Sequence, residues 1–249
     1  MRKFKLLVFL MLFAVIIFSS SSCKKEGPAT FTLVMKAKYG NQSFALNATN
    51  TDATGRYISM TSLTFYLSHI SLIKTNGTTV TLSDLAIFDF TDSSTLSVSV
   101  NNVEGDFSGI SFSCGVDSNQ NKTNANEAVF PSPFSGLWGM YWDMNSGYRY
   151  EVMEGKWAAT DSFNMPNYLV YHIGNNINYR QTKLNKNFSV CCKTPGTLTL
   201  YLDVQQIFSN SITGESINIV TQPETSSGVG DNPVIASTFA DNFSNAFTF

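Results

Sequence analysis

The stretch Leu63-Thr-Phe-Tyr-Leu-Ser-His-Ile-Ser-Leu-Ile73, followed by Asn76-Gly77, decides the fold class. Its aromatic and branched aliphatic residues favour an extended strand. Asn-Gly is the strongest short hairpin signal, because both residues accept the positive φ that a type I′ turn requires. The returning strand is then expected at residues 78–82. The sequence therefore predicts a β-hairpin in this region.

Similar strand patterns recur on both sides of this hairpin, at residues 31–39, 96–100, 109–116, 148–153, 168–173, 188–192 and 198–204. Turn residues separate them about every 8 to 15 residues. This pattern predicts an all-β fold, an antiparallel β-sandwich or barrel-like sheet with long loops at 117–126 and 221–232. Neither an internal repeat nor a linker divides the chain, so residues 31–249 are expected to form a single β domain.

The N-terminal residues are typical of an export signal. A basic leader precedes an unbroken apolar run from Leu6 to Phe18. This run is shorter than the roughly 20 residues of a membrane-spanning helix and has the length of a signal-peptide hydrophobic region. Small residues then lead directly into Cys23, as at a bacterial lipoprotein cleavage site, although Ser20 stands where Leu is more usual.

We therefore expect residues 1–22 to be a lipoprotein signal peptide and Cys23 to become the lipidated first residue of the mature chain. Residues 23–30 would form a tether to the membrane, with the protein in the periplasm or at the cell surface. The alternative is an ordinary secretory signal with an incidental cysteine. Both alternatives predict an exported protein.

Charge and motifs exclude several functional classes. Removal of residues 1–22 leaves 16 − 3 = 13 basic and 18 acidic residues, a net charge of −5. Without a basic patch interleaved with aromatic residues, nucleic acid is not an expected partner. The sequence lacks a G-x-S-x-G elbow, a P-loop and a dinucleotide fingerprint. Glu151 and Glu154 are three residues apart in a predicted strand, so they face opposite sides and form no glycosidase pair. A non-enzymatic role is therefore predicted.

The stretch from Gly136 to Gly155 has an unusual composition. It contains two of the three Trp, three of the eight Met and three of the ten Tyr of the chain. Aromatic rings interleaved with thioethers suit a site for a soft, polarisable ligand. Each aromatic residue taken alone could also be an ordinary core residue. A third reading is a platform that binds glycan or protein without metal, with the rings of Trp138 and Tyr141 exposed.

The chain has two histidines, His69 and His172. Two histidines cannot complete a tetrahedral zinc site by themselves. Together with a methionine or an aromatic partner they would satisfy Cu(I), which accepts two or three soft donors. Each histidine could instead be a hydrogen-bonded structural residue. The polar loop 117–126 offers oxygen ligands that could hold Ca²⁺, although a solvated loop is the simpler interpretation.

Three cysteines remain if Cys23 is lipidated, an odd number in an oxidising compartment. One arrangement joins Cys114 to either Cys191 or Cys192. The alternative is a strained disulfide between the neighbours Cys191 and Cys192. A thiolate metal site that uses Cys114 and one of these neighbours is also possible, although the spacing does not match C-x-x-C.

Five pieces of the chain, taken in order, carry a resemblance to a known family. They are Phe65–Ser68, Gly109–Asp117, Met140–Tyr148 with Glu154-Gly155, Tyr171–Gly174 and Ala240–Phe247. Together they resemble the MbnP-like family of exported copper-binding proteins, relatives of MopE and CorA. The resemblance implies a β-rich exported protein that holds copper for storage, handover or uptake. In relatives the site combines His with a Trp that can be oxidised to kynurenine, sometimes by a partner di-haem enzyme of the cytochrome c peroxidase type.

Carried over by position, the resemblance implies that His172 is the principal copper ligand and Trp142 the adjacent aromatic residue. Met144 stands where relatives have a second Trp or a His, and its thioether could donate to Cu(I). His69 stands where Asn is common in the family. Met140 and His69 are further candidate ligands.

Overall fold

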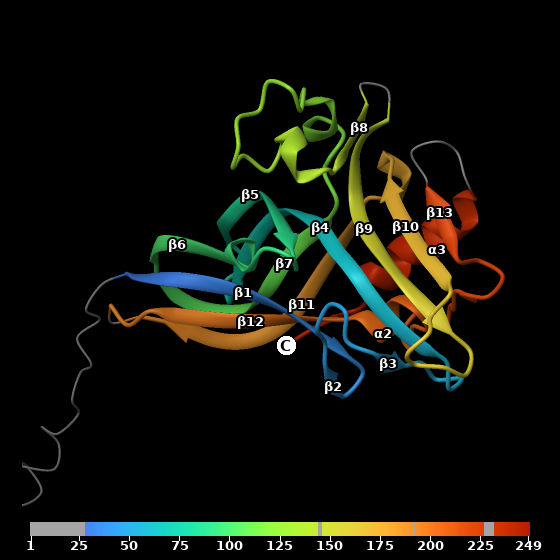
Figure 1. The fold of residues 1–249 in the computed structure, drawn as a ribbon. Coiled ribbons are helices and arrows are strands. Elements are labelled where there is room, and N and C mark those ends of the chain that lie inside the picture. Colours follow the sequence, from blue (N-terminus) through green and yellow to red (C-terminus); the bar gives the residue numbers. More distant parts are fainter. Residues whose placement is uncertain (1–27, 144–145, 192, 227–231) are drawn as a thin grey trace, which may run out of the picture.

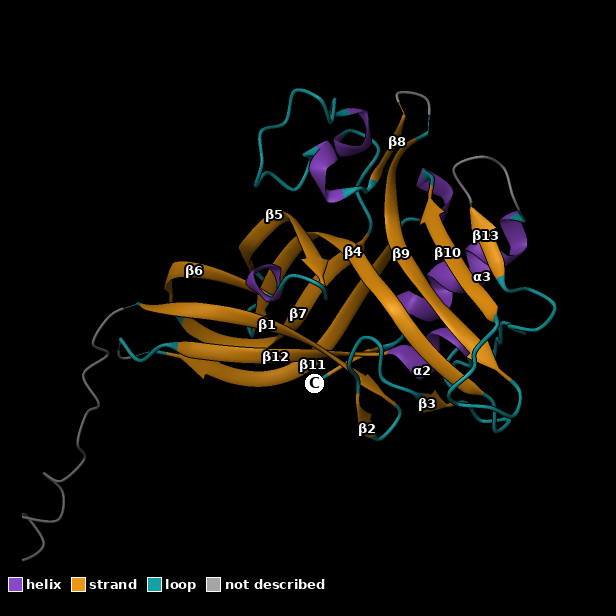
Figure 2. Cartoon of the chain, in the orientation of Figure 1, coloured by secondary structure: helices purple, strands orange, loops and turns teal. Residues whose placement is uncertain are grey.

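The computed structural model describes residues 28–143, 146–191, 193–226 and 232–249. Two β-sheets face each other, helix α3 (Pro233–Ser244) lies against the larger one, and helix α2 (Val204–Phe208) packs against α3 and β1 (Ala29–Tyr39) of the smaller one (Figures 1 and 2). Within these residues, neither helix is long and apolar enough to cross a membrane. The predicted signal peptide and Cys23 lie outside the described residues.

The smaller sheet has five strands in the described part of the chain. Their order is β14 (Phe247–Thr248), β12 (Gly196–Asp203), β1 (Ala29–Tyr39) and β2 (Gln42–Ser43), and β6 (Ser97–Val103) also pairs with β1. Strands β1 and β12 run parallel over their whole shared length. Because β1 and β12 come from opposite ends of the domain, this pairing ties the two ends together.

The larger sheet follows the order β11 (Arg180–Val190), β7 (Gly105–Cys114), β4 (Tyr57–Lys74), β9 (Gly147–Ala158), β10 (Asn167–Gly174) and β13 (Glu224–Ser226). Three more strands join it: β3 (Asn50–Thr51) and β5 (Thr79–Asp89) pair with β4, and β8 (Tyr141–Asp143) pairs with β9. The first half of β4 pairs with β9 and its second half with β7. This long strand therefore connects the two halves of the sheet.

The predicted all-β sandwich is confirmed, and so is the hairpin that ends at Gly77, which has φ +85°. Two features differ from the prediction. The pairs β1–β12 and β10–β13 are parallel, whereas an antiparallel arrangement was expected. Helices α2 (Val204–Phe208) and α3 (Pro233–Ser244) were not predicted. Helix α3 has strong local signals, since Asn232 caps it and a proline follows at the first position.

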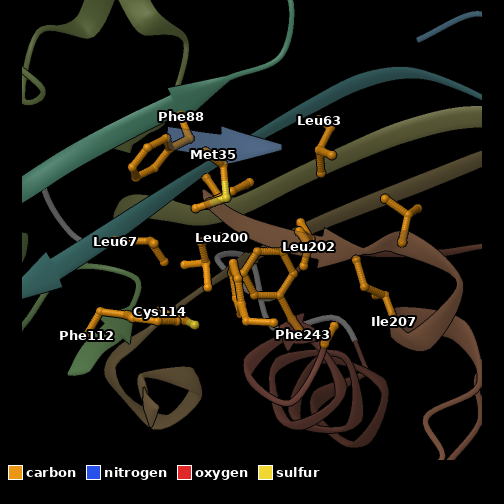
Figure 3. Packing of buried hydrophobic residues seen from close by; sticks show 14 of the residues in the cluster. Met35, Leu63, Leu67, Phe88, Phe112, Cys114, Leu200, Leu202, Ile207 and Phe243 are labelled. Carbon is orange, nitrogen blue, oxygen red and sulfur yellow. The ribbon is translucent and has the colours of Figure 1, made fainter. Parts of the chain in front are cut away.

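The main hydrophobic core fills the space between the two sheets (Figure 3). Alternate residues of β1 and β12 point into it, as period-2 patterning requires. From the larger sheet, Phe65 of β4 contributes a ring that lies 5.1 Å from the ring of Phe243 on α3. Figure 3 labels Phe243 together with other members of this core: Met35, Leu63, Leu67, Phe88, Phe112, Cys114, Leu200, Leu202 and Ile207. Helix α3 thus completes a core that the strands alone leave open.

A second, smaller cluster contains Tyr66, Ile87, Val116, Ala125, Met140, Tyr148, Tyr150 and Val152. The segment between β7 and β8, drawn in green to yellow-green in Figure 1, lies beside β8. Buried tyrosine hydroxyls bind this segment: Tyr66 donates to the Pro133 carbonyl at 2.6 Å and Tyr148 to the Phe134 carbonyl at 2.8 Å. Because a buried hydroxyl without a partner is costly, these bonds hold the segment and therefore β8 in place.

Candidate metal centre

Trp142 lies in the short strand β8, at an irregularity in its pairing with β9. Strand β9 begins at Gly147, which has φ +71°. The amide of Tyr148 donates to the side-chain oxygen of Asn121 at 2.8 Å, so the polar loop 117–126 holds the start of β9. The indole lies against Gly174 of β10, where an added Cβ would be 2.5 Å from its Cζ3 atom. Only glycine at position 174 allows this close approach.

His172 lies two residues before Gly174, so both residues are on the same face of β10. Its Nε2 atom is 2.7 Å from the Oε1 atom of Glu154 on the neighbouring strand β9. The register pairs His172 with Val152 and Val170 with Glu154, so this contact is a diagonal one. The fold therefore places the imidazole of His172 and the indole of Trp142 close together on one face of β10.

Arg149 completes this cluster. Its guanidinium carbon lies 5.4 Å from the centre of the Trp142 ring, and its Nη1 atom donates to the Gly139 carbonyl at 2.8 Å. Burial lowers the pKa of Arg149, and the negative charge of Glu154 opposes that shift. The cluster thus contains an imidazole, an indole, one acidic group and one basic group.

The two methionine candidates have different places. Met144 follows Trp142 by two residues and lies outside the described residues. Met140 is 1% exposed and belongs to the second hydrophobic cluster. Its thioether is therefore part of the packing beneath the segment that carries Trp142.

His69 lies too far from His172 to share a metal ion with it. The register places His172 level with Thr64 two strands away, and His69 is five residues further along β4. Strand geometry then separates the two residues by on the order of 20 Å. His69 has φ +51° at a register shift, and its Nε2 atom is 2.9 Å from the Oδ2 atom of Asp117. The prediction that His69 is a further ligand of the site at His172 is therefore wrong.

The polar loop 117–126 is held by its own hydrogen bonds. Oδ1 of Asp117 accepts from the amides of Asn119 and Gln120 at 2.7 and 2.8 Å. Burial raises the pKa of Asp117, but the bonds from these amides and from His69 outweigh it, so the pKa is lowered overall. Asn124 accepts from the Asn126 amide in the same way. These oxygens, which the Ca²⁺ interpretation needs, already accept hydrogen bonds from protein groups.

Across the described ranges, no three His, Cys, Asp or Glu side chains gather around a point that could hold one metal ion. The site at His172 therefore lacks the carboxylate- and thiolate-rich composition of zinc and calcium centres. A metal ion bound there would have to be one that accepts only two or three ligands.

The structure does not form the predicted bridge from Cys114 to Cys191. Cys114 pairs with Arg180 at one end of the β7–β11 ladder, and Cys191 follows Val190 at the other end. Ten residues of strand separate the two cysteines by about 30 Å, far beyond the reach of a disulfide. Burial raises the pKa of the Cys114 thiol well above its usual value. Cys192 lies outside the described residues, so its pairing with Cys191 stays a prediction.

The rings that the glycan- or protein-binding alternative requires are half-buried. Trp138 and Tyr141 pack against the second cluster, and the Nε1 atom of Trp138 donates to the Ser132 carbonyl at 2.9 Å. The exposed apolar side chains of this segment are Val129 and Leu137, each 81% exposed, and Phe130, which is 49% exposed and whose ring lies 4.9 Å from that of Trp138. The aromatic surface of this segment is therefore centred on Phe130 and not on the predicted rings of Trp138 and Tyr141.

Comparisons with known proteins give a family match and a structural match. A family model described as MbnP matches residues 28–227. Among solved structures, MbnP from Methylosinus trichosporium superposes with a TM-score of 0.58 at 15% sequence identity. The match covers 84% of this chain and 87% of that chain. A search of curated proteins finds no match.

Proposed function

Because this chain belongs to the MbnP family, which is associated with copper, we propose that it binds a copper ion, most readily as Cu(I), beside Trp142 and His172. One observation carries the proposal. The indole of Trp142 lies against Gly174, two residues from His172 on the same strand face. The chain thereby joins an imidazole and an aromatic ring that are far apart in the sequence.

The donors present suit Cu(I). This ion is satisfied by two or three soft ligands, and imidazole and thioether groups are both suitable. His172 supplies the imidazole, and Met144, two residues after Trp142, would supply the thioether. The scarcity of gathered carboxylates and thiolates is no obstacle to such a site, because Cu(I) requires neither.

The remaining groups of the cluster would shape the site. The side chain of His172 is 17% exposed, so the imidazole is largely sheltered from water. Trp142 covers the end of β10, and the guanidinium of Arg149 lies over its ring. We propose that the indole limits access of water and oxidants to the bound ion.

We further propose that the mature protein is exported and anchored through lipidated Cys23, and that it stores, hands over or takes up copper. The sequence of residues 1–23 supports this part of the proposal. A di-haem enzyme that oxidises Trp142 is a proposed partner on the family resemblance alone. Intact-mass analysis of protein from its native host would reveal oxidation of the tryptophan.

The function is tested with the mature protein that carries Cys23→Ser, titrated with Cu(I) against a chromophoric chelator. We expect one-to-one binding that weakens by about 100-fold or more, roughly 3 kcal/mol, in His172→Ala. His69→Ala is the matched control and should retain the wild-type affinity within a factor of two or so. Equal losses in both variants, or a wild-type protein that does not compete with the chelator, would overturn the proposal.

A further inference from the structure

A cavity of about 320 Å³ lies at the end of the molecule where β1 and β4 meet helix α2, near the labels α2 and β3 in Figure 1. Its walls come from three parts of the chain: Tyr39 at the end of β1, the segment 52–58, and the segment 205–219. We propose that this cavity binds a small organic carboxylate. It is separate from the proposed copper site, because roughly 25 Å of strand β9 lies between the levels of Ile58 and Gly174.

Arg56 brings the charged donor group of this cavity. Its Nε atom donates to Oδ2 of Asp52 at 2.7 Å, and this contact fixes the guanidinium. Oδ1 of Asp52 is occupied as well, because it accepts from Thr54 and from the Arg56 amide. The Nη1 and Nη2 groups of Arg56 make no hydrogen bond to any residue that the structure describes. This unused edge of the planar guanidinium has the spacing for a bidentate contact to a carboxylate.

Two more donors of the cavity are unused within the described residues. Tyr39 is 4% exposed, and its buried hydroxyl has no hydrogen-bond partner there. Burial raises the pKa of Tyr39, as do the charges of Asp52 and Asp203, and the charge of Arg56 opposes them. The hydroxyl thus keeps its hydrogen and lies near the guanidinium. The side-chain amide of Gln205 on α2 is likewise without a hydrogen bond in this part of the chain. Because an unpaired buried donor is costly, a ligand oxygen here would be stabilising.

Apolar side chains complete the walls. They are Ile58, Phe208, Ile217 and Ile219, and all four are buried. The volume of the cavity is at the lower end of the range for small-molecule sites. The unused donors require oxygen acceptors, and the guanidinium favours charged ones. The apolar walls favour a carbon skeleton over an inorganic anion. A small carboxylic acid in its ionised form has both features.

The first test titrates the ¹⁵N-labelled mature protein that carries Cys23→Ser with acetate, hexanoate and benzoate. We expect saturable chemical-shift changes in the amides of the three wall segments with hexanoate or benzoate. Acetate should bind more weakly, because it lacks an apolar body. Hexylamine has the chain without the carboxylate, and inorganic phosphate is an anion without the chain. Neither of these two matched probes should produce the same changes.

The second test repeats the titration with variants. Tyr39→Phe should bind the carboxylate about 10-fold more weakly, since a hydrogen bond to a charged group is lost. This variant should fold normally, because the hydroxyl has no partner within the described residues. Arg56→Lys keeps the charge but loses the bidentate fork, and its affinity should fall by about 10-fold or more. Tyr168→Phe is the matched control, because Tyr168 is 66% exposed and lies outside the cavity.

Shift changes of equal size with hexylamine or phosphate would overturn the inference, and so would unchanged affinity in both Tyr39→Phe and Arg56→Lys. The absence of saturable changes with all three carboxylates would also overturn it, since water would then satisfy the unused donors. Cu(I) affinity should be the same in both variants as in the wild type. A protein that binds no Cu(I) would overturn the proposed function and leave the carboxylate titration to decide this inference, so the two failures are distinguishable.

Discussion

The larger sheet holds two His–carboxylate pairs of nearly equal length in opposite settings. In the pair His172–Glu154, the imidazole is 17% exposed and the carboxylate 43% exposed. In the pair His69–Asp117, the imidazole is 51% exposed and the carboxylate 27% exposed. The sheltered group is thus the histidine in the first pair and the acid in the second.

The backbone explains this reversal. His172 lies in β10 two residues before Gly174, which Trp142 covers, and its side chain is largely sheltered from solvent. His69 occupies a left-handed conformation, which Asn and His tolerate better than most residues, at a bulge that turns its ring toward solvent.

The two pairs show that a short His–carboxylate contact does not by itself mark a functional site. In the pair His172–Glu154, the sheltered group is the imidazole of the proposed copper ligand. In the pair His69–Asp117, the imidazole is one of several groups that contact the carboxylate of Asp117, which also accepts hydrogen bonds from two loop amides. The surroundings, and not the contact distance, assign the role.

The largest expected effect comes from Gly174→Ala, which would displace the indole of Trp142 that covers the strand next to His172. The new methyl group would lie 2.5 Å from Cζ3 of Trp142 and 2.7 Å from the Tyr148 carbonyl oxygen. We expect a loss of about 2 to 3 kcal/mol in unfolding free energy, measured by urea denaturation, because the backbone cannot move away easily. Cu(I) affinity should fall as the indole is displaced.

Gly136→Ala is the matched control, since its added methyl group would meet the nearest atom at an ordinary 3.7 Å. The imidazole signals of His69 should stay unchanged in both variants. Equal stability of the two variants would contradict the close packing of Trp142 on Gly174.

A smaller effect is expected from a third carboxyl group, which has no histidine partner. Glu151 lies on β9 three residues before Glu154 and on the opposite face, as predicted, and is 1% exposed. Neither of its oxygens has a hydrogen-bond partner among the residues that the structure describes. Burial raises the pKa of Glu151 well above its usual value, and the charge of Arg180 opposes that shift only in part.

Glu151→Gln should therefore stabilise the protein at pH 7 by roughly 1 to 3 kcal/mol. In the wild type, the unfolded chain releases this proton above about pH 4.5 while the folded chain keeps it, so unfolding free energy falls as pH rises. The gain should vanish near pH 4. Urea denaturation at both pH values measures it, and the exposed Glu224→Gln should show no such dependence. A variant destabilised at pH 7 would contradict this account.

The smallest effect is expected from Asp117→Asn in the exposed pair. The side-chain oxygen of Asn can still accept from the loop amides, so the change removes the charge and its interaction with His69. We expect a loss below about 1 kcal/mol, because exposed ion pairs contribute little. The pKa of Asp117 is lowered in the folded state, so this contribution is present above the unfolded pKa of the carboxyl and disappears as pH falls through the folded pKa.

Unfolding measurements at pH 7 and pH 3 would follow this contribution, and Cu(I) affinity should not change. A loss of copper affinity comparable to that of His172→Ala would remove the distinction between the two pairs.

Local patterns in the sequence were sufficient for part of this structure. Period-2 alternation and Asn76-Gly77 predicted the strands and the β4–β5 hairpin, because both signals act over a few neighbouring residues. His172 and Trp142 were singled out by the family resemblance and not by a local pattern, and their role as a metal site stays a prediction. The faces of Glu151 and Glu154 also followed from alternation alone.

Tertiary structure alone decided the rest, because register between strands depends on contacts that are distant in the sequence. Nothing local to β9 or β10 shows that Glu154 lies diagonally across from His172, or that Trp142 packs on Gly174. The distance between the two histidines and the separation of Cys114 from Cys191 are likewise set by pairing order and register. The parallel β1–β12 pair joins strands more than a hundred residues apart, and only the packing of the whole core can select it.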